Sequence, residues 1–149
     1  MNNMNKSILF LLLSLSILYS CNYIPCRGQD YIIEGITHKE LIEKLNKLRS
    51  DYSEYYSNDD HINKHVPLYY IALSWKDLNL VIDCEVFIGD KIPTPPAYLK
   101  FRGIRPPLGG YTDINSKELD KKLNEVYINK FESEILSKLD VKWKRDPCW

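Results

Sequence analysis

The chain has 149 residues, and its 20 lysines and arginines balance 20 aspartates and glutamates. This length corresponds to one domain, and 44% hydrophobic and 27% charged residues are the proportions of a folded globular protein rather than of a disordered chain. The chain has no net charge and so lacks the excess of lysine and arginine that neutralises phosphates in nucleic-acid-binding proteins. We therefore expect no nucleic-acid partner.

A short apolar segment lies near the N-terminus. Residues 1–7 are polar and contain Lys6, and residues 8–18 are apolar except for two serines. A helix of this length rises about 16 Å, whereas a membrane span needs roughly 20 residues to cross ~30 Å of hydrocarbon. A basic start followed by a short apolar core and small residues is typical of a secretory signal peptide.

The sequence Leu18-Tyr19-Ser20-Cys21 follows this segment and resembles a bacterial lipobox. The resemblance covers these four residues and the segment before them. It implies that residues 1–20 are a lipoprotein signal peptide, that the Cys21 sulfur carries diacylglycerol, and that the new amino group is acylated. Two or more acyl chains anchor a protein stably in a lipid bilayer, whereas a single chain binds only marginally. The alternative is ordinary secretion, with Cys21 kept as a disulfide partner.

The residue after Cys21 indicates the membrane in which the protein is anchored. Asn22 carries no evident retention signal, so in a host with two membranes the outer membrane is favoured, on its periplasmic or surface side. We expect residues 21–30 to form a lipidated tether and residues 31–149 to form a single domain.

Three further cysteines lie in the mature chain. If Cys21 carries lipid, one disulfide and one free thiol are expected. Cys84 lies in an alternating apolar segment and is expected to be buried as a small hydrophobic residue. Cys26 and Cys148 lie near the two ends of the domain, which are often close together, so we favour a Cys26–Cys148 disulfide. The cysteines are scattered without a Cys-x-x-Cys pair, and we expect neither a metal nor a cofactor.

The first half of the domain predicts a short strand and a helix. Residues 31–34 predict a brief strand. The Thr37–Glu40 segment fits a capping box, and leucines and tyrosines spaced three and four residues apart extend the predicted helix to about residue 56. A polar loop follows.

The second half predicts strands and then a helix. Residues 68–75 and 80–88 predict an antiparallel hairpin, and the alternation of residues 98–102 predicts a third strand. A helix capped by Asn115 or Ser116 is expected to run to about Leu139, and residues 141–143 predict a short edge strand. These elements predict an α+β domain, in which two amphipathic helices pack on one face of an antiparallel sheet of three to four strands.

A basic, glycine-containing segment over residues 102–110 is the main candidate site. Its guanidinium groups, on Arg102 and Arg105, are suited to bidentate contacts with a carboxylate or phosphate. The segment lacks the Gly-Lys-Ser/Thr ending of a phosphate-binding loop, and a structural loop is favoured over an anion-binding site. Tyrosine is abundant in the chain, and Tyr111 is expected near the surface, where tyrosine favours binding. Arg102, Arg105 and Tyr111 are therefore the candidate partner-binding residues.

Two other groups of residues carry side chains suited to catalysis or metal binding. Asp83 and Glu85 lie on one strand face about 7 Å apart, a spacing compatible with acid–base catalysis or simply with a hydrated sheet face. His61 and His65 are four residues apart but lack the glutamate of a His-Glu-x-x-His motif, and a solvated loop is favoured over a metal site.

Three functional classes are compatible with these features. The sequence shows no recognisable set of nucleophile, base and orienting group, as an enzyme would need. We therefore favour a small protein-binding lipoprotein of the envelope, of the immunity or exclusion type. A structural envelope lipoprotein and an enzyme acting on envelope material are the alternatives, and no catalytic residue is assigned.

The lipobox resemblance predicts a mature protein that begins with lipidated Cys21. Mass spectrometry of the mature N-terminus measures both cleavage and acylation. The Cys21→Ser variant is expected to lose both, because the lipid is attached through the sulfur. An unacylated wild-type terminus downstream of Cys21 contradicts the prediction.

Overall fold

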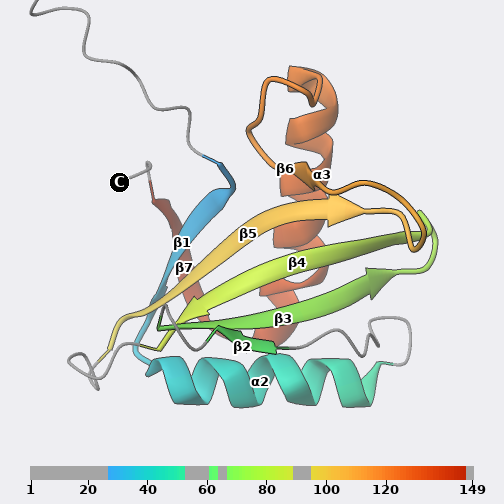
Figure 1. Cartoon of the computed structure of the whole chain (residues 1–149). Coiled ribbons are helices and arrows are strands. Elements are labelled where there is room, and N and C mark those ends of the chain that lie inside the picture. The colour runs from blue at the N-terminus through green and yellow to red at the C-terminus, as the bar shows by residue number, and fades with distance from the viewer. Residues whose placement is uncertain (1–26, 53–60, 64–66, 89–94, 147–149) are drawn as a thin grey trace, which may run out of the picture.

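A computed structural model describes residues 27–52, 61–63, 67–88 and 95–146. The lipobox, Cys26, Cys148 and His65 lie outside these ranges. The predicted α+β class is confirmed, since one antiparallel sheet packs with two α-helices (Figure 1). The strands are β1 (Gln29–Glu34), β2 (His61–Asn63), β3 (Leu68–Trp75), β4 (Leu80–Phe87), β5 (Ala97–Arg105), β6 (Thr112–Asp113) and β7 (Lys142–Asp146).

The sheet is larger than the sequence predicts. Six strands run in the order β2-β3-β4-β5-β1-β7, and β6 pairs with β5 beside this path. The prediction of three to four strands was too low because β2 and β6 are too short to give a sequence pattern, and because the brief strands predicted at residues 31–34 and 141–143 both join the sheet. The strand predicted at residues 31–34 begins earlier, at Gln29, and lies between β5 and β7. The predicted edge strand extends to Asp146.

The first helix, α2 (His38–Asp51), has the predicted capping box. The Thr37 hydroxyl accepts from the Glu40 backbone N–H at 3.3 Å, and the Glu40 carboxylate accepts from the Thr37 N–H at 2.7 Å. The helix ends at Asp51, with Tyr52 as its C-cap, so the predicted end near residue 56 was too late.

The second helix, α3 (Lys121–Glu134), begins later than predicted. Its N-cap is Asp120, whereas Asn115 adopts a left-handed φ of 61° and donates from its side chain to the Gly28 carbonyl. After α3 the chain continues as a short 3₁₀ helix, η2 (Leu136–Leu139). Apolar residues recur every four positions from Leu119 to Leu139, but this stripe is only partly buried, and Leu123 is 41% exposed. Residues spaced by four drift about 40° per step around a helix, so a long run of them cannot all face the core.

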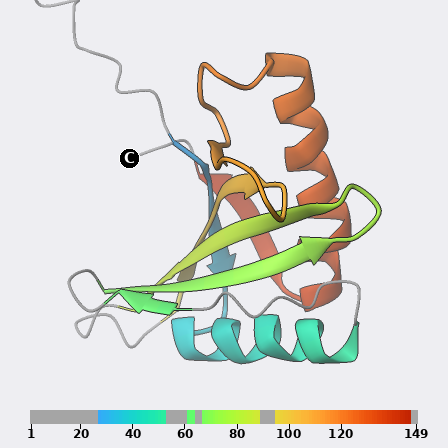
Figure 2. The ribbon, with the colours of Figure 1, turned by 45° about the vertical axis from the view of Figure 1, so that its right-hand side comes forward.

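Both helices lie on the same side of the sheet (Figure 2). Their buried side chains join those of the sheet in one core. Leu41, Leu45 and Leu48 of α2 join Ile128 and Phe131 of α3 in this cluster. Aromatic rings dominate its centre, where the ring centroids of Phe101 and Phe131 are 4.6 Å apart and those of Tyr31 and Phe131 are 5.6 Å apart. Such stacked rings stabilise a core beyond their buried area.

All described helices and strands lie between Gln29 and Asp146. A fragment of residues 22–149 therefore contains the whole sheet, both helices and their common core. Neither α2 nor α3 has the length and apolar character needed to span a membrane, and this finding concerns the described ranges alone.

The capping box predicts a measurable contribution to stability. Thr37→Ala removes the side-chain acceptor for the Glu40 N–H and is expected to lower the free energy of unfolding by about 1 kcal/mol. Chemical denaturation of the 22–149 fragment measures this change. Thr37→Ser keeps the acceptor and is the matched control. Equal stability of the alanine variant and the wild type would show that the cap contributes nothing.

Candidate binding surface on the open face of the sheet

The face of the sheet opposite α2 and α3, here called the open face, carries charged and aromatic side chains. Strand residues alternate between faces, so Cys84 and Val86 of β4 are fully buried toward the helices, whereas Asp83, Glu85 and Phe87 belong to the open face. The prediction that Asp83 and Glu85 share a face is confirmed. Cys84 is a buried free thiol, as expected, and burial raises its pKa well above the usual value.

A β-bulge in β5 directs both arginines to this face. Cys84 pairs with Phe101 and Asp83 pairs with Gly103, so Arg102 is the extra residue. Phe101 and Ile104 are both buried although they are three residues apart, which regular alternation would not allow. A bulge redirects the side chains that follow it, and Arg102 and Arg105 consequently lie on the same face.

Arg102 lies between two tyrosine rings and a buried carboxylate. Its guanidinium carbon is 6.0 Å from the ring centroid of Tyr70 and 5.9 Å from that of Tyr111, within the range of cation–π attraction. Its Nη1 forms an ion pair with Glu85, which is only 7% exposed. We call Arg102, Tyr70, Tyr111 and Glu85 the arginine cluster.

The surroundings of Arg102 and Tyr111 raise the pKa of both groups. Burial tends to lower the pKa of Arg102, but the hydrogen bond and charge of Glu85 outweigh it and raise the pKa. Burial and the neighbouring Asp113 carboxylate raise the pKa of the Tyr111 hydroxyl. Arg102 therefore stays charged and the Tyr111 hydroxyl keeps its proton at neutral pH.

Arg105 forms a second ion pair on the open face. Its Nε donates to the Asp83 carboxylate at 3.0 Å, and both side chains are partly exposed. The two carboxylates that were considered for acid–base catalysis are thus each paired with an arginine. This arrangement favours fixed charges at a binding surface over a pair of carboxyl groups that share a proton.

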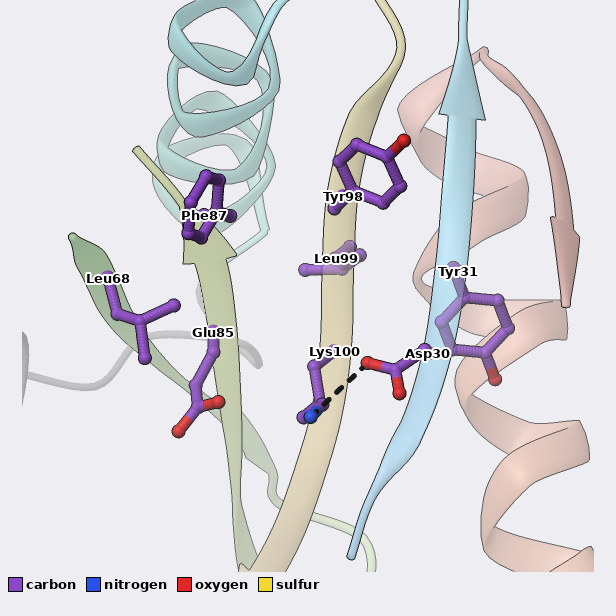
Figure 3. Close-up of a pocket in the computed structure, with 8 residues that line it drawn as sticks. All are labelled: Asp30, Tyr31, Leu68, Glu85, Phe87, Tyr98, Leu99 and Lys100. Carbon is purple, nitrogen blue, oxygen red and sulfur yellow. Dashed lines mark ion pairs between the residues drawn. The ribbon is translucent and has the colours of Figure 1, made fainter. Parts of the chain in front are cut away.

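A pocket of about 380 Å³ lies on the same face beside the arginine cluster (Figure 3). Apolar and aromatic side chains line one part of it, and Glu85, Lys100 and Asp30 line the other. Lys100 Nζ lies 3.4 Å from Asp30 Oδ1. Its lining residues are Asp30, Tyr31, Leu68, Glu85, Phe87, Tyr98, Leu99 and Lys100.

The structure brings the predicted binding residues together, but it places the two arginines in a strand and not in a loop. Arg102 and Tyr111 are in contact and Arg105 lies in the same strand, yet Arg102–Arg105 belong to β5 and not to a loop. The loop begins at Pro106, whose carbonyl accepts from the Gly109 N–H at 3.1 Å. Sequence reasoning missed Tyr70 and the pocket residues other than Glu85, because only strand register reveals that they are neighbours.

Among the described residues, no group of three or more His, Cys, Asp or Glu side chains is arranged to hold a metal ion. His61 lies in β2, and its proposed partner His65 lies outside the described ranges. No protein-family model, curated protein or solved structure matches the chain.

The contact between β5 and Tyr111 makes Gly103 a sensitive position. A Cβ at Gly103 would lie 2.5 Å from the Tyr111 ring and 2.6 Å from the Thr112 carbonyl oxygen. Gly103→Ala is therefore expected to displace Tyr111 and lower the free energy of unfolding by about 1–3 kcal/mol. Gly110→Ala is the matched control, because a Cβ there meets no atom within 4 Å. Thermal unfolding compares the two variants, and equal stability would contradict the packing of Tyr111 on Gly103.

Proposed function

We propose that this chain is a lipid-anchored bacterial envelope protein that binds a protein partner, of the immunity or exclusion type, through the open face of its sheet. The observation that carries the proposal is the arginine cluster, in which Arg102 is held between Tyr70 and Tyr111 and paired with Glu85. Arginine and tyrosine are enriched among the residues that contribute most to protein–protein binding.

The arginine cluster is held in place before any partner binds. Long side chains that become ordered on binding cost free energy, and prior ordering reduces this cost. Arg102 already has ion-pair and ring contacts on several sides, and Gly103 provides the space for the Tyr111 ring. Tyr111 itself is 39% exposed and offers aromatic surface to a partner. These features support a preformed binding surface.

The lipid tether would hold this surface near the membrane. Arg27, the first described residue, has its Nε 3.9 Å from Asp113, and Asp113 lies 3.9 Å from the Arg102 Nε. The stretch from Cys21 to Arg27 reaches at most about 20 Å when fully extended. A lipid at Cys21 would therefore keep the arginine cluster close to the bilayer, where proteins that enter or assemble in the envelope can be bound.

Capture from envelope extract tests the proposal. The immobilised 22–149 fragment is expected to retain a specific protein. Tyr111→Ala removes exposed ring area, and a combined Arg102→Gln and Glu85→Gln variant removes both charges without leaving one of them buried alone. Each variant is expected to weaken binding at least tenfold, because residues in the centre of an interface contribute about 2 kcal/mol or more.

The controls separate binding from folding. Val126→Ser changes an exposed residue of α3, on the opposite side of the sheet, and is expected to leave capture unchanged. Circular dichroism confirms that each variant is folded. Absence of a specific partner for the wild-type fragment, or undiminished capture by folded variants of the arginine cluster, would refute the proposed function.

A further inference from the structure

We propose that the pocket beside the arginine cluster receives a basic side chain, an arginine or a lysine, of the protein partner. The inference rests on the proposed function and deepens it, because it names the chemistry of one partner residue. It is carried by the shape of the pocket, by its apolar wall and by the balance of charges along its floor (Figure 3).

The apolar wall is suited to the stem of a long side chain. Leu68 and Phe87 are direct partners in the β3–β4 register, and Tyr98 follows on β5, so the three residues form one row across the sheet. Phe87 is 37% exposed. Lysine and arginine bury their methylene stems on apolar surfaces while the charged end stays with polar groups. Aromatic rings also attract a guanidinium or ammonium group.

The next row of the sheet supplies the charge. Glu85 pairs in register with Lys100, Lys100 with Asp30, and Asp30 with Asp146. The row therefore holds three carboxylates and one lysine, with Asp146 beyond Asp30 and outside the pocket lining, and Arg102 adds a second cation at Glu85. The row keeps an excess of one negative charge. An incoming cation would balance it, whereas an incoming carboxylate would add to it.

The environment of Asp30 agrees with this charge balance. Burial raises the pKa of Asp30, and its neighbours Asp146 and Glu85 raise it further, while Lys100 lowers it. The net shift is upward because burial outweighs the attraction of Lys100, which leaves the ionised Asp30 carboxylate incompletely stabilised. A second cation at this position would stabilise the ionised carboxylate, since opposite charges a few ångströms apart favour the charged form.

The size of the pocket limits what it can hold. A volume of about 380 Å³ is at the lower end of the range of ligand pockets, roughly 300–1,000 Å³. It suits one long side chain projecting from a partner surface. The arginine cluster lies directly beside it and shares Glu85 with it, so one partner can contact both.

Titration with capped amino acids tests the pocket without a known partner. Backbone amide NMR signals of the ¹⁵N-labelled 22–149 fragment are followed as N-acetyl methylamides of arginine, lysine, norleucine and glutamate are added. The basic probes are expected to shift the signals of residues 85–87 and 98–100, with a Kd on the order of 1 mM or weaker, as for small fragments. Norleucine should bind several-fold more weakly, and glutamate should cause no such shifts.

Two variants that change the charge of the pocket in opposite directions make the test specific. Asp30→Asn removes a carboxylate and is expected to weaken binding of the basic probes about tenfold, as for loss of a charge-assisted contact. Lys100→Met removes the competing cation and is expected to strengthen their binding. Lys47→Met, at an exposed position of α2, is the matched control and should change nothing.

The outcomes distinguish the pocket from the proposed function. Equal or stronger binding of the glutamate probe, weaker binding of basic probes to Lys100→Met, or no response to any probe would overturn the assignment of the pocket. If the basic probes bind as expected but no partner is captured, the pocket assignment stands and the proposed protein-binding function fails.

Discussion

The β-bulge at Arg102 is the constraint on which the open face depends. It allows Phe101 and Ile104 to enter the core although they are three residues apart, and it directs Arg102 and Arg105 to the opposite side. One inserted residue thus allows apolar side chains to face the core and arginine side chains to face the solvent. Without it, regular alternation would place one of the two arginines among the apolar side chains that face the helices.

The charges on the open face are arranged in neighbouring pairs, and this arrangement permits a densely charged sheet surface. Glu85 pairs with Arg102, Asp83 with Arg105 and Asp30 with Lys100, each across adjacent strands. Opposite charges at facing positions stabilise strand pairing, whereas like charges destabilise it. The exception is Asp30, which faces Asp146 of β7 on one side and lines the pocket on the other side, next to Lys100.

Local patterns predicted the elements of the fold more successfully than their arrangement. The capping box at Thr37, the β3 and β4 strands and the burial of Cys84 were predicted because each depends on residues close together in the chain. The start of α3 was mispredicted, because the side chain of Asn115, one of the two expected caps, bonds Gly28, which lies far away in sequence. The number of strands was underestimated because β2 has only three residues and β6 only two, too few to show an alternating pattern.

The sequence by itself determined the α+β class, the alternation that puts Asp83 and Glu85 on one face, and Arg102, Arg105 and Tyr111 as candidate binding residues. Only the tertiary structure decided that Arg102 lies between Tyr70 and Tyr111, and that Asp30 and Glu85 line one pocket with Phe87. Alternation follows from backbone geometry within one strand. Which side chains are adjacent on different strands follows from the strand register and from the bulge. Both depend on the packing of the whole sheet.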